Sequence, residues 1–128
     1  MNAKKIKQSA ENLEKSVCNL RTALKQDTLS DLELSGILKY FELCYELSWK
    51  TLKKRGEALG RRIASPREAF QYALEAGIIT NESPWIDMIE DRNLSVHVYD
   101  RDGAEQIYKK IKARYLAEFE KLVLHAPE

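Results

Sequence analysis

Residues 30–59 read SDLELSGILKYFELCYELSWKTLKKRGEAL, and this stretch decides the fold class. Its main apolar residues recur every three or four positions, which is the period of an amphipathic α-helix. These residues are Leu34, Ile37, Leu38, Phe41, Tyr45 and Leu52. Other apolar side chains cover further sides of the same helix: Leu43, Cys44, Leu47 and Trp49. Because a helix that is apolar nearly all round must be buried nearly all round, we expect a central helix or a face used by a second chain.

The sequence indicates where this helix begins and where it ends. Ser30 is followed three residues later by Glu33, the pattern of a capping box, in which each side chain bonds the other residue's backbone N–H. Gly60 follows the last apolar turn, and glycine is the usual residue where a helix ends in the left-handed conformation. The predicted helix therefore begins after Ser30 and ends at about Leu59.

Periodic apolar residues on either side predict four more helices, at about 4–25, 65–77, 83–98 and 102–124. The connections between them are short, so neighbouring helices should run antiparallel. The sequence therefore predicts an all-α fold, an antiparallel up-and-down four-helix bundle with one additional short helix. We expect residues 1–128 to form a single domain of this kind.

Composition narrows the class of protein. Hydrophobic residues make up 44% and charged residues 32% of the chain, with 5 Gly and 3 Pro, which favours amphipathic helices over strands and turns. No apolar run approaches the roughly 20 residues that a membrane span needs, and the polar, basic N-terminus is unlike a signal peptide. We therefore expect a soluble, cytoplasmic protein with no membrane partner. Cys18 and Cys44 lie on or beside apolar stripes and are expected to be buried, reduced thiols.

The sequence contains no recognisable metal site. His97 and His125 are far apart in the chain, and no cysteine pair is close. Residues 100–102, Asp-Arg-Asp, have the spelling of a nucleotidyltransferase metal site, but no Gly-Ser turn precedes them. We interpret them as a turn in which Asp102 caps the last helix. We therefore expect no metal, no cofactor and no nucleotidyl transfer by this chain itself.

The net charge of +1 says nothing about partners, but basic residues gather near the end of the second helix. They are Lys50, Lys53, Lys54, Arg55, Arg61 and Arg62. One interpretation is a solvated helix end. The other is a rim that contacts phosphates, as in proteins that bind nucleic acid.

The fourth helix carries the most informative pair of residues. Arg92 falls in the middle of a face that is otherwise apolar, where an arginine is costly unless it is paired or opens into a polar cleft. His97 lies five residues later, on a second stripe about 100° round the helix. We expect the helix to end or distort near His97, which would bring imidazole and guanidinium to one site. The alternative is ordinary, with Arg92 in an ion pair and His97 favoured by the helix dipole.

The segment DRNLSVHVY at 91–99 resembles the signature of HEPN domains, in which an arginine and a polar residue precede a histidine by a short spacer. The tyrosine two residues after the histidine resembles the subgroup that is paired with minimal nucleotidyltransferases. The segment FELCYELSWKTLK at 41–53 resembles the second helix of the nucleotidyltransferase substrate-binding protein family, a branch of that group. Three further segments extend the likeness: SPR at 65–67, AGII at 76–79 and WIDMIEDRN at 85–93. The likeness covers roughly residues 34–115.

The resemblance implies a small helical bundle that is usually a homodimer and is encoded beside a minimal nucleotidyltransferase. In many such pairs the helical member is a toxin, a metal-independent ribonuclease with RNA as substrate, and the nucleotidyltransferase is its antitoxin. On that hypothesis Arg92 stabilises charge on the phosphate, His97 moves protons, and Asn93 orients a catalytic group or bonds the phosphate. Lys50, Lys53, Lys54 and Arg55 would guide the RNA backbone. The resemblance also implies that the partner adenylylates Tyr99.

Two other functions stay open at the level of sequence. The chain would be a non-catalytic subunit that presents a substrate to a two-component nucleotidyltransferase, or a purely structural helical adaptor. All three hypotheses predict the same fold. They differ in what Arg92 does, because only an adaptor would need this arginine for stability alone.

Overall fold

The computed structural model describes residues 2–97 and 100–125, and all regular secondary structure in those ranges is helical. The elements are α1 (Asn2–Ala23), α2 (Asp31–Ala58), α3 (Pro66–Glu75), α4 (Ser83–Ser95), α5 (Arg101–Lys110), η1 (Ile111–Tyr115) and α6 (Leu116–Leu124). The last three follow one another without a break and form one long helix that contains a π-helical turn, η1. The predicted all-α bundle of four helices with one additional short helix is confirmed.

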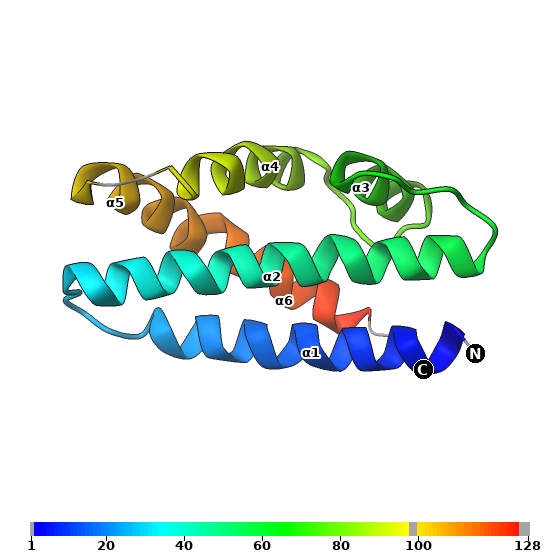
Figure 1. The fold of residues 1–128 in the computed structure, drawn as a ribbon, viewed down its shortest axis with the longest axis horizontal. Helices are drawn as coiled ribbons and strands as arrows, with labels where there is room; N and C mark the ends of the chain where they lie inside the picture. The colour runs from blue at the N-terminus through cyan, green and yellow to red at the C-terminus, as the bar shows by residue number, and fades with distance from the viewer. Residues whose placement is uncertain (1, 98–99, 126–128) are drawn as a thin grey trace.

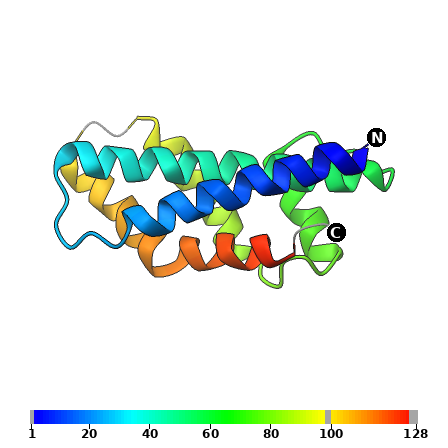
Figure 2. The ribbon, with the colours of Figure 1, turned by 90° about the horizontal axis from the view of Figure 1, so that it is seen from below.

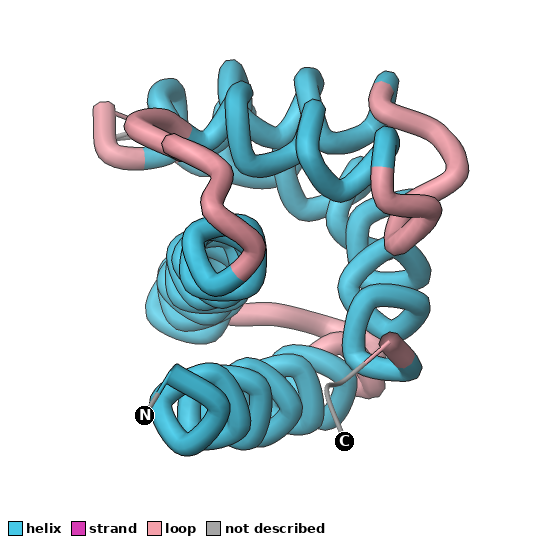
Figure 3. The backbone as a smooth tube through the Cα atoms, turned by 90° about the vertical axis from the view of Figure 1, so that its right-hand side faces the viewer, coloured by secondary structure: helices cyan, strands magenta, loops and turns pink. Residues whose placement is uncertain are grey.

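The helices form layers around α2 (Figure 1). The helices α1 and α2 run antiparallel side by side, and α3 and α4 lie along the other side of α2. The long helix α5–η1–α6 begins beside α4 and crosses behind α2 to reach α1 (Figures 1 and 2). Figure 3 looks nearly along α1 and α2 and shows the other helices grouped around α2 on all but one of its sides.

The second helix is central, as its sequence predicts, because every other α-helix contacts it. Phe41, Cys44 and Leu52 are completely buried, whereas Leu43 on the outer side is 43% exposed. Its first turn is closed by the predicted capping box between Ser30 and Glu33. Apolar residues all round α2 therefore mark a central helix with one strip left open to solvent.

An aromatic cluster joins α2, α4 and the long helix in the middle of the core. The ring of Phe41 stacks on Tyr115 with centroids 5.5 Å apart, and Trp85 meets Phe119 edge-on at 5.7 Å. Such pairs add to the free energy of burial and prefer particular ring orientations. They fix where α4 sits against its two neighbours, and α4 carries the candidate site.

Two local predictions, about a cap and a cysteine, are wrong. The N-cap of α5 is Asp100 and makes no side-chain capping bond, so Asp102 lies inside the first turn. Cys18 is exposed, because it lies about 100° round α1 from the buried Val17, while Cys44 is buried as expected. Burial raises the pKa of the Cys44 thiol to about 11, so this thiol stays protonated at neutral pH.

The fourth helix ends earlier than the predicted Val98. Its last helical residue is Ser95, and the His97 N–H bonds the Leu94 carbonyl oxygen three residues back, at 2.9 Å. No helix within 2–97 or 100–125 is long and apolar enough to cross a membrane.

Candidate functional site

Two neighbouring residues near the end of α4 point to opposite edges of that helix. Successive helical residues are separated by about 100°, so Asp91 and Arg92 face different directions. Asp91 faces the long helix α5–η1–α6, and Arg92 faces α2. The two edges differ in burial, because Asp91 is buried and Arg92 is partly exposed.

On the α2 edge, the Arg92 guanidinium is held only loosely. Its Nε lies 3.5 Å from Oε1 of Glu46, while 33% of the Arg92 side chain stays exposed. This Nε is itself buried and makes no hydrogen bond. Glu46 shares its charge with two further donors, Trp49 Nε1 at 3.3 Å and Lys50 Nζ at 3.5 Å. A half-exposed guanidinium with unused donors is suited to bind a phosphate or carboxylate.

A second carboxylate from α2 closes the same edge one turn further along. The Ser95 hydroxyl lies 3.0 Å from Glu42 Oε2 and 2.9 Å from the Arg92 carbonyl oxygen. This bond joins the end of α4 to α2. Ser95 itself lies between Arg92 and His97 in the sequence. Glu42, Glu46, Arg92 and Ser95 therefore form a row of polar groups where α2 and α4 meet.

His97 and Asn93 both face solvent, and His97 lies just beyond the end of α4. No hydrogen bond or ion pair joins the side chains of Arg92 and His97, although both are within the described part of the chain. The helix does end near His97 as predicted, but no hydrogen bond links the imidazole to the guanidinium within the described part of one chain. Tyr99 lies outside the described residues.

The other edge of α4 is buried and carries a hydrogen-bonded pair that we did not predict from the sequence. Asp91 is 3% exposed and accepts the Tyr115 hydroxyl at 2.5 Å. Lys110 Nζ, at 3.3 Å, is the second donor to this carboxylate. Burial, and then the hydrogen bond to Asp91, raise the pKa of Tyr115, so its phenol stays protonated.

The spacing of the last helix contains a signal for this pair. Its core residues follow one another in steps of four: Ile107, Ile111, Tyr115 and Phe119. Each four-residue step advances about 40° round a regular α-helix, so such a run drifts off one face. A π turn between Ile111 and Tyr115 takes up the extra rotation and keeps all four side chains in the core.

The basic residues near the end of α2 are partly occupied within the chain. Arg61 pairs with Glu75 at 2.8 Å, and Arg55 donates to the His125 carbonyl oxygen at 2.7 Å. Lys50 lies beside Glu46, which connects this cluster to the Arg92 row. Lys54 is exposed and Lys53 is half-buried.

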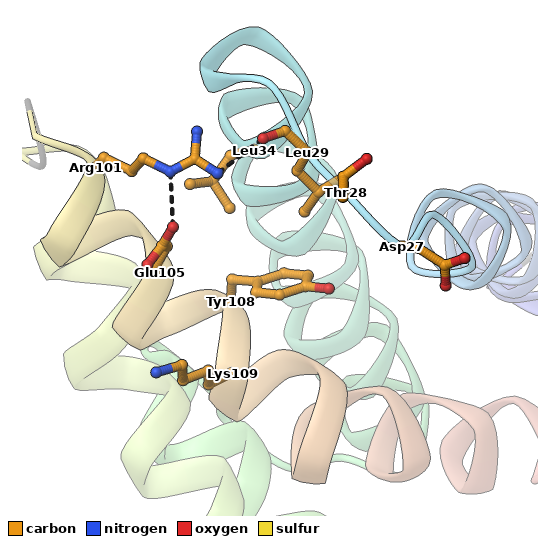
Figure 4. Close-up of a pocket in the computed structure, with 8 residues that line it drawn as sticks. All are labelled: Asp27, Thr28, Leu29, Leu34, Arg101, Glu105, Tyr108 and Lys109. Carbon is orange, nitrogen blue, oxygen red and sulfur yellow. Dashed lines mark hydrogen bonds and ion pairs between the residues drawn. The ribbon is translucent and has the colours of Figure 1, made fainter.

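A pocket of about 280 Å³ lies elsewhere, between the α1–α2 turn and α5 (Figure 4). Two cations, Arg101 and Lys109, line it, and Arg101 already bonds Glu105 and Asp31, each at 2.7 Å, and the Leu29 carbonyl oxygen at 2.8 Å. An arginine with these partners ties the turn to α5 and offers few donors to a ligand. We therefore take the row of polar groups between α2 and α4 as the candidate site.

Comparison with known proteins agrees with this architecture. The sequence model of one family, described as nucleotidyltransferase substrate binding protein like, matches residues 8–126. The probable ribonuclease HepT of Haemophilus influenzae is 29% identical over 98 residues, which span 73% of this chain and 64% of that protein. The match thus spans a little less than two thirds of the relative's length.

Two solved structures have a similar fold. A crystal structure from Thermus thermophilus has a TM-score of 0.81 and 26% identity, covering 91% of this chain and 99% of that one. A Haemophilus influenzae protein, described as having the fold of a substrate binding domain of a nucleotidyltransferase, has a TM-score of 0.72. It is 24% identical, and the match covers 98% of this chain and 99% of that one.

Proposed function

This chain belongs to the nucleotidyltransferase substrate binding protein like family, a branch of the HEPN domains, and we propose that it is a metal-independent endoribonuclease. In this proposal the enzyme is the toxin of a toxin–antitoxin pair, and a cognate minimal nucleotidyltransferase neutralises it. The similarity to a probable ribonuclease supports the activity. The family itself implies association with a nucleotidyltransferase.

One observation carries the proposal, namely the state of Arg92. Its guanidinium is partly exposed, has a buried Nε without a hydrogen bond, and faces a carboxylate that two other donors share. A purely structural arginine at this position would be expected to form a tight, fully bonded ion pair. An arginine held this loosely is ready to exchange its carboxylate for an RNA phosphate.

The chemistry needs a base, an acid and a cation. A base removes the proton of the 2′-hydroxyl as its oxygen attacks phosphorus, and an acid protonates the departing 5′-oxygen. Arg92 stabilises the charge on the phosphorane between these steps, and Asn93 orients a reacting group or bonds the phosphate. The products are a 2′,3′-cyclic phosphate and a free 5′-hydroxyl.

A homodimer supplies the second proton-transfer group. One chain offers one imidazole at this end of α4, and a two-fold axis would bring two copies of His97 to one cleft. Two apolar side chains next to His97 are exposed, Leu94 by 58% and Val96 by 44%, which supports an interface there. In the dimer one His97 acts as base and the other as acid.

The RNA backbone would run over the nearby end of α2. Lys50, Lys53, Lys54 and Arg55 lie along this part of the helix, and Lys50 adjoins the Arg92 row through Glu46. Their charges would attract the phosphates without reading the sequence of bases.

The partner would neutralise the enzyme through Tyr99. In the proposed step the phenol oxygen bonds the α-phosphorus of ATP held by the nucleotidyltransferase, pyrophosphate leaves, and the phenol proton passes to solvent. The transferred phosphate would then compete for Arg92, and the adenosine would fill the cleft. Coexpression with the partner should add one or more AMP groups to the mass of the chain, and Tyr99→Phe should abolish the addition. Full inhibition without added mass would mean that the partner acts by binding alone.

A non-catalytic substrate-binding subunit is the second candidate. It is favoured because no hydrogen bond or ion pair joins the described side chains of Arg92 and His97 within one chain, and a subunit that only binds needs no proton transfer. In this case Arg92 would bind an anionic substrate for the partner. Such a chain would bind the partner's substrate and would not cleave RNA.

The test is RNA cleavage by the purified chain in the presence of EDTA, with the ends of the products identified. The wild type should leave cyclic phosphates, and His97→Ala should lower the rate by at least about 100-fold while keeping helicity and dimer. His125→Ala is the matched control, because His125 lies at the end of α6, and it should cleave normally. Cleavage that survives in His97→Ala would remove this residue from the mechanism, and a wild type that never cleaves would favour the second candidate.

A further inference from the structure

The π turn ends at Tyr115, whose hydroxyl bonds Asp91 on α4. The N–H of Leu116 bonds the Ile111 carbonyl oxygen five residues back, which is the π-helical pattern. In a regular α-helix the two four-residue steps from Ile107 to Tyr115 would drift about 80° round the helix, and the π turn removes part of this drift, so Tyr115 stays buried and reaches Asp91 on α4. π turns of this kind are rare and often lie at functional sites.

Tyr115 is held on two sides and cannot shift easily. Its side chain is completely buried, and its ring stacks on Phe41 of α2 at an interplanar angle of 16°. Its hydroxyl donates to Asp91, whose carboxylate also accepts from Lys110. One tyrosine therefore connects α2, the long helix and α4.

We propose that Tyr115 is a positioning residue for Arg92, a role that rests on the ribonuclease function proposed above. Together with the aromatic contacts of Trp85, the bond from Tyr115 to Asp91 fixes the rotation of α4 about its own axis. Because Arg92 is the next residue on that helix, its direction toward α2 follows from the direction of Asp91. The loose contact between Arg92 and Glu46 is too weak to set this rotation by itself.

Neither Tyr115 nor Asp91 can touch RNA, since Tyr115 is 0% and Asp91 only 3% exposed. Their effect on cleavage must therefore pass through α4. Positioning errors of about 1 Å at a reacting group lower rates strongly, even when the altered residue is remote from the chemistry. Loss of the Tyr115–Asp91 bond should thus lower kcat more than it raises KM.

The experiment compares Tyr115→Phe with Ser9→Ala. The first variant keeps the stacked ring and removes one buried interhelical hydrogen bond. The second also removes one buried interhelical hydrogen bond, the 2.6 Å contact between Ser9 and Thr51, but at the α1–α2 interface. Both should lower the thermal midpoint, so stability alone cannot distinguish them.

Activity distinguishes the two variants. Tyr115→Phe should lower kcat on RNA by about tenfold with KM within about twofold of the wild type. Ser9→Ala should keep both constants per folded molecule. Equal kcat in the two variants would overturn the positioning role.

A second measurement does not depend on RNA cleavage, so it tests the positioning role even if the wild type is inactive. The NMR signal of the Arg92 Nε–H, assigned by its loss in Arg92→Lys, reports the surroundings of this buried group. Tyr115→Phe should shift or broaden the signal, and Ser9→Ala should leave it in place. An inactive wild type would overturn the proposed function, whereas an unmoved signal in Tyr115→Phe would overturn the positioning role.

Discussion

The two edges of α4 are held in opposite ways. On the edge that faces the long helix, Asp91 is 3% exposed and accepts the Tyr115 hydroxyl at 2.5 Å. On the edge that faces α2, Arg92 keeps 33% of its side chain exposed, with its Nε 3.5 Å from Glu46. Neighbouring residues in the sequence thus occupy a tight buried pair and a loose half-open one.

The two edges of α4 therefore have different roles, one in stability and the other in binding. A buried carboxylate with two donors gives α4 one orientation, because leaving the carboxylate or its donor unpaired costs free energy. A half-exposed arginine contributes little to stability but can bind an anion without first breaking a strong bond. On this view the buried edge stabilises the fold and the open edge performs the chemistry.

The largest expected loss of stability comes from a substitution at the buried edge of α4. Tyr115→Ala should lower the free energy of unfolding by about 3–5 kcal/mol, because it removes a fully buried aromatic ring and leaves a cavity. Ile89→Ala, at a half-buried position of α4, should cost roughly 1 kcal/mol. Urea denaturation of the two variants measures both, and equal costs would break the distinction between the edges.

A second comparison, between a buried and an exposed carboxylate of α4, tests whether burial determines the cost of losing the charge. Asp91→Asn should cost about 1–2 kcal/mol, because a charged acceptor of the Tyr115 hydroxyl is replaced by a neutral one. Asp87→Asn removes the exposed pair with Arg114, in which the side chains are 46% and 44% exposed, and should cost under about 1 kcal/mol. If Asp87→Asn proved the more costly, burial would not be what distinguishes these carboxylates.

Much of the fold was predictable from periodicity, since one apolar face per helix is a local property of the chain. The capping box at Ser30 and the end of α2 at Gly60 are local too, and both predictions are confirmed. The π turn was missed because the four-residue steps near Ile111 and Tyr115 look like an ordinary helical face. Their drift becomes meaningful only when it is compared with the 3.6-residue repeat.

The site was less predictable, and the reason is physical. The sequence places Arg92 on an apolar face, but its partner Glu46 lies on another helix. The periodicity of each helix does not determine how two helices are aligned against each other. Asp91 was missed for the same reason, since its donor Tyr115 lies 24 residues away. The roles of His97, Asn93 and Tyr99 stay predictions.

Alkaline pH should lower the free energy of unfolding by a smaller amount, because two tyrosines are buried. Burial raises the pKa of Tyr115, and also that of Tyr45 to about 12. The folded chain then holds phenol protons that the unfolded chain releases, so this stability is complete below about pH 10 and falls as pH rises. Each tyrosine contributes a slope of up to about 1.4 kcal/mol per pH unit there.

The measurement is urea denaturation between pH 9 and pH 11. Tyr115→Phe should reduce the steepness of the decline, because one of the two phenols is gone. A wild type whose stability is level up to pH 11 would contradict the burial of these hydroxyls.

The smallest expected effect is on the open edge. Glu46→Gln should change the free energy of unfolding by less than about 1 kcal/mol, because its pair with Arg92 is half-exposed. It should also lower the KM for RNA by about threefold, since the guanidinium loses a competing carboxylate. Weaker RNA binding in Glu46→Gln would show that Glu46 helps to hold the substrate.

Arg92→Ala tests the division between the two edges most directly, when cleavage rate and denaturation midpoint are measured on the same preparation. The loosely held arginine should cost under about 1 kcal/mol of stability, because its pair with Glu46 is half-exposed. The rate per folded molecule should fall by at least about 100-fold, because the phosphorane loses its cation. A stability lowered by several kcal/mol, with the rate per folded molecule retained, would contradict the account and make Arg92 a structural residue like Asp91 beside it.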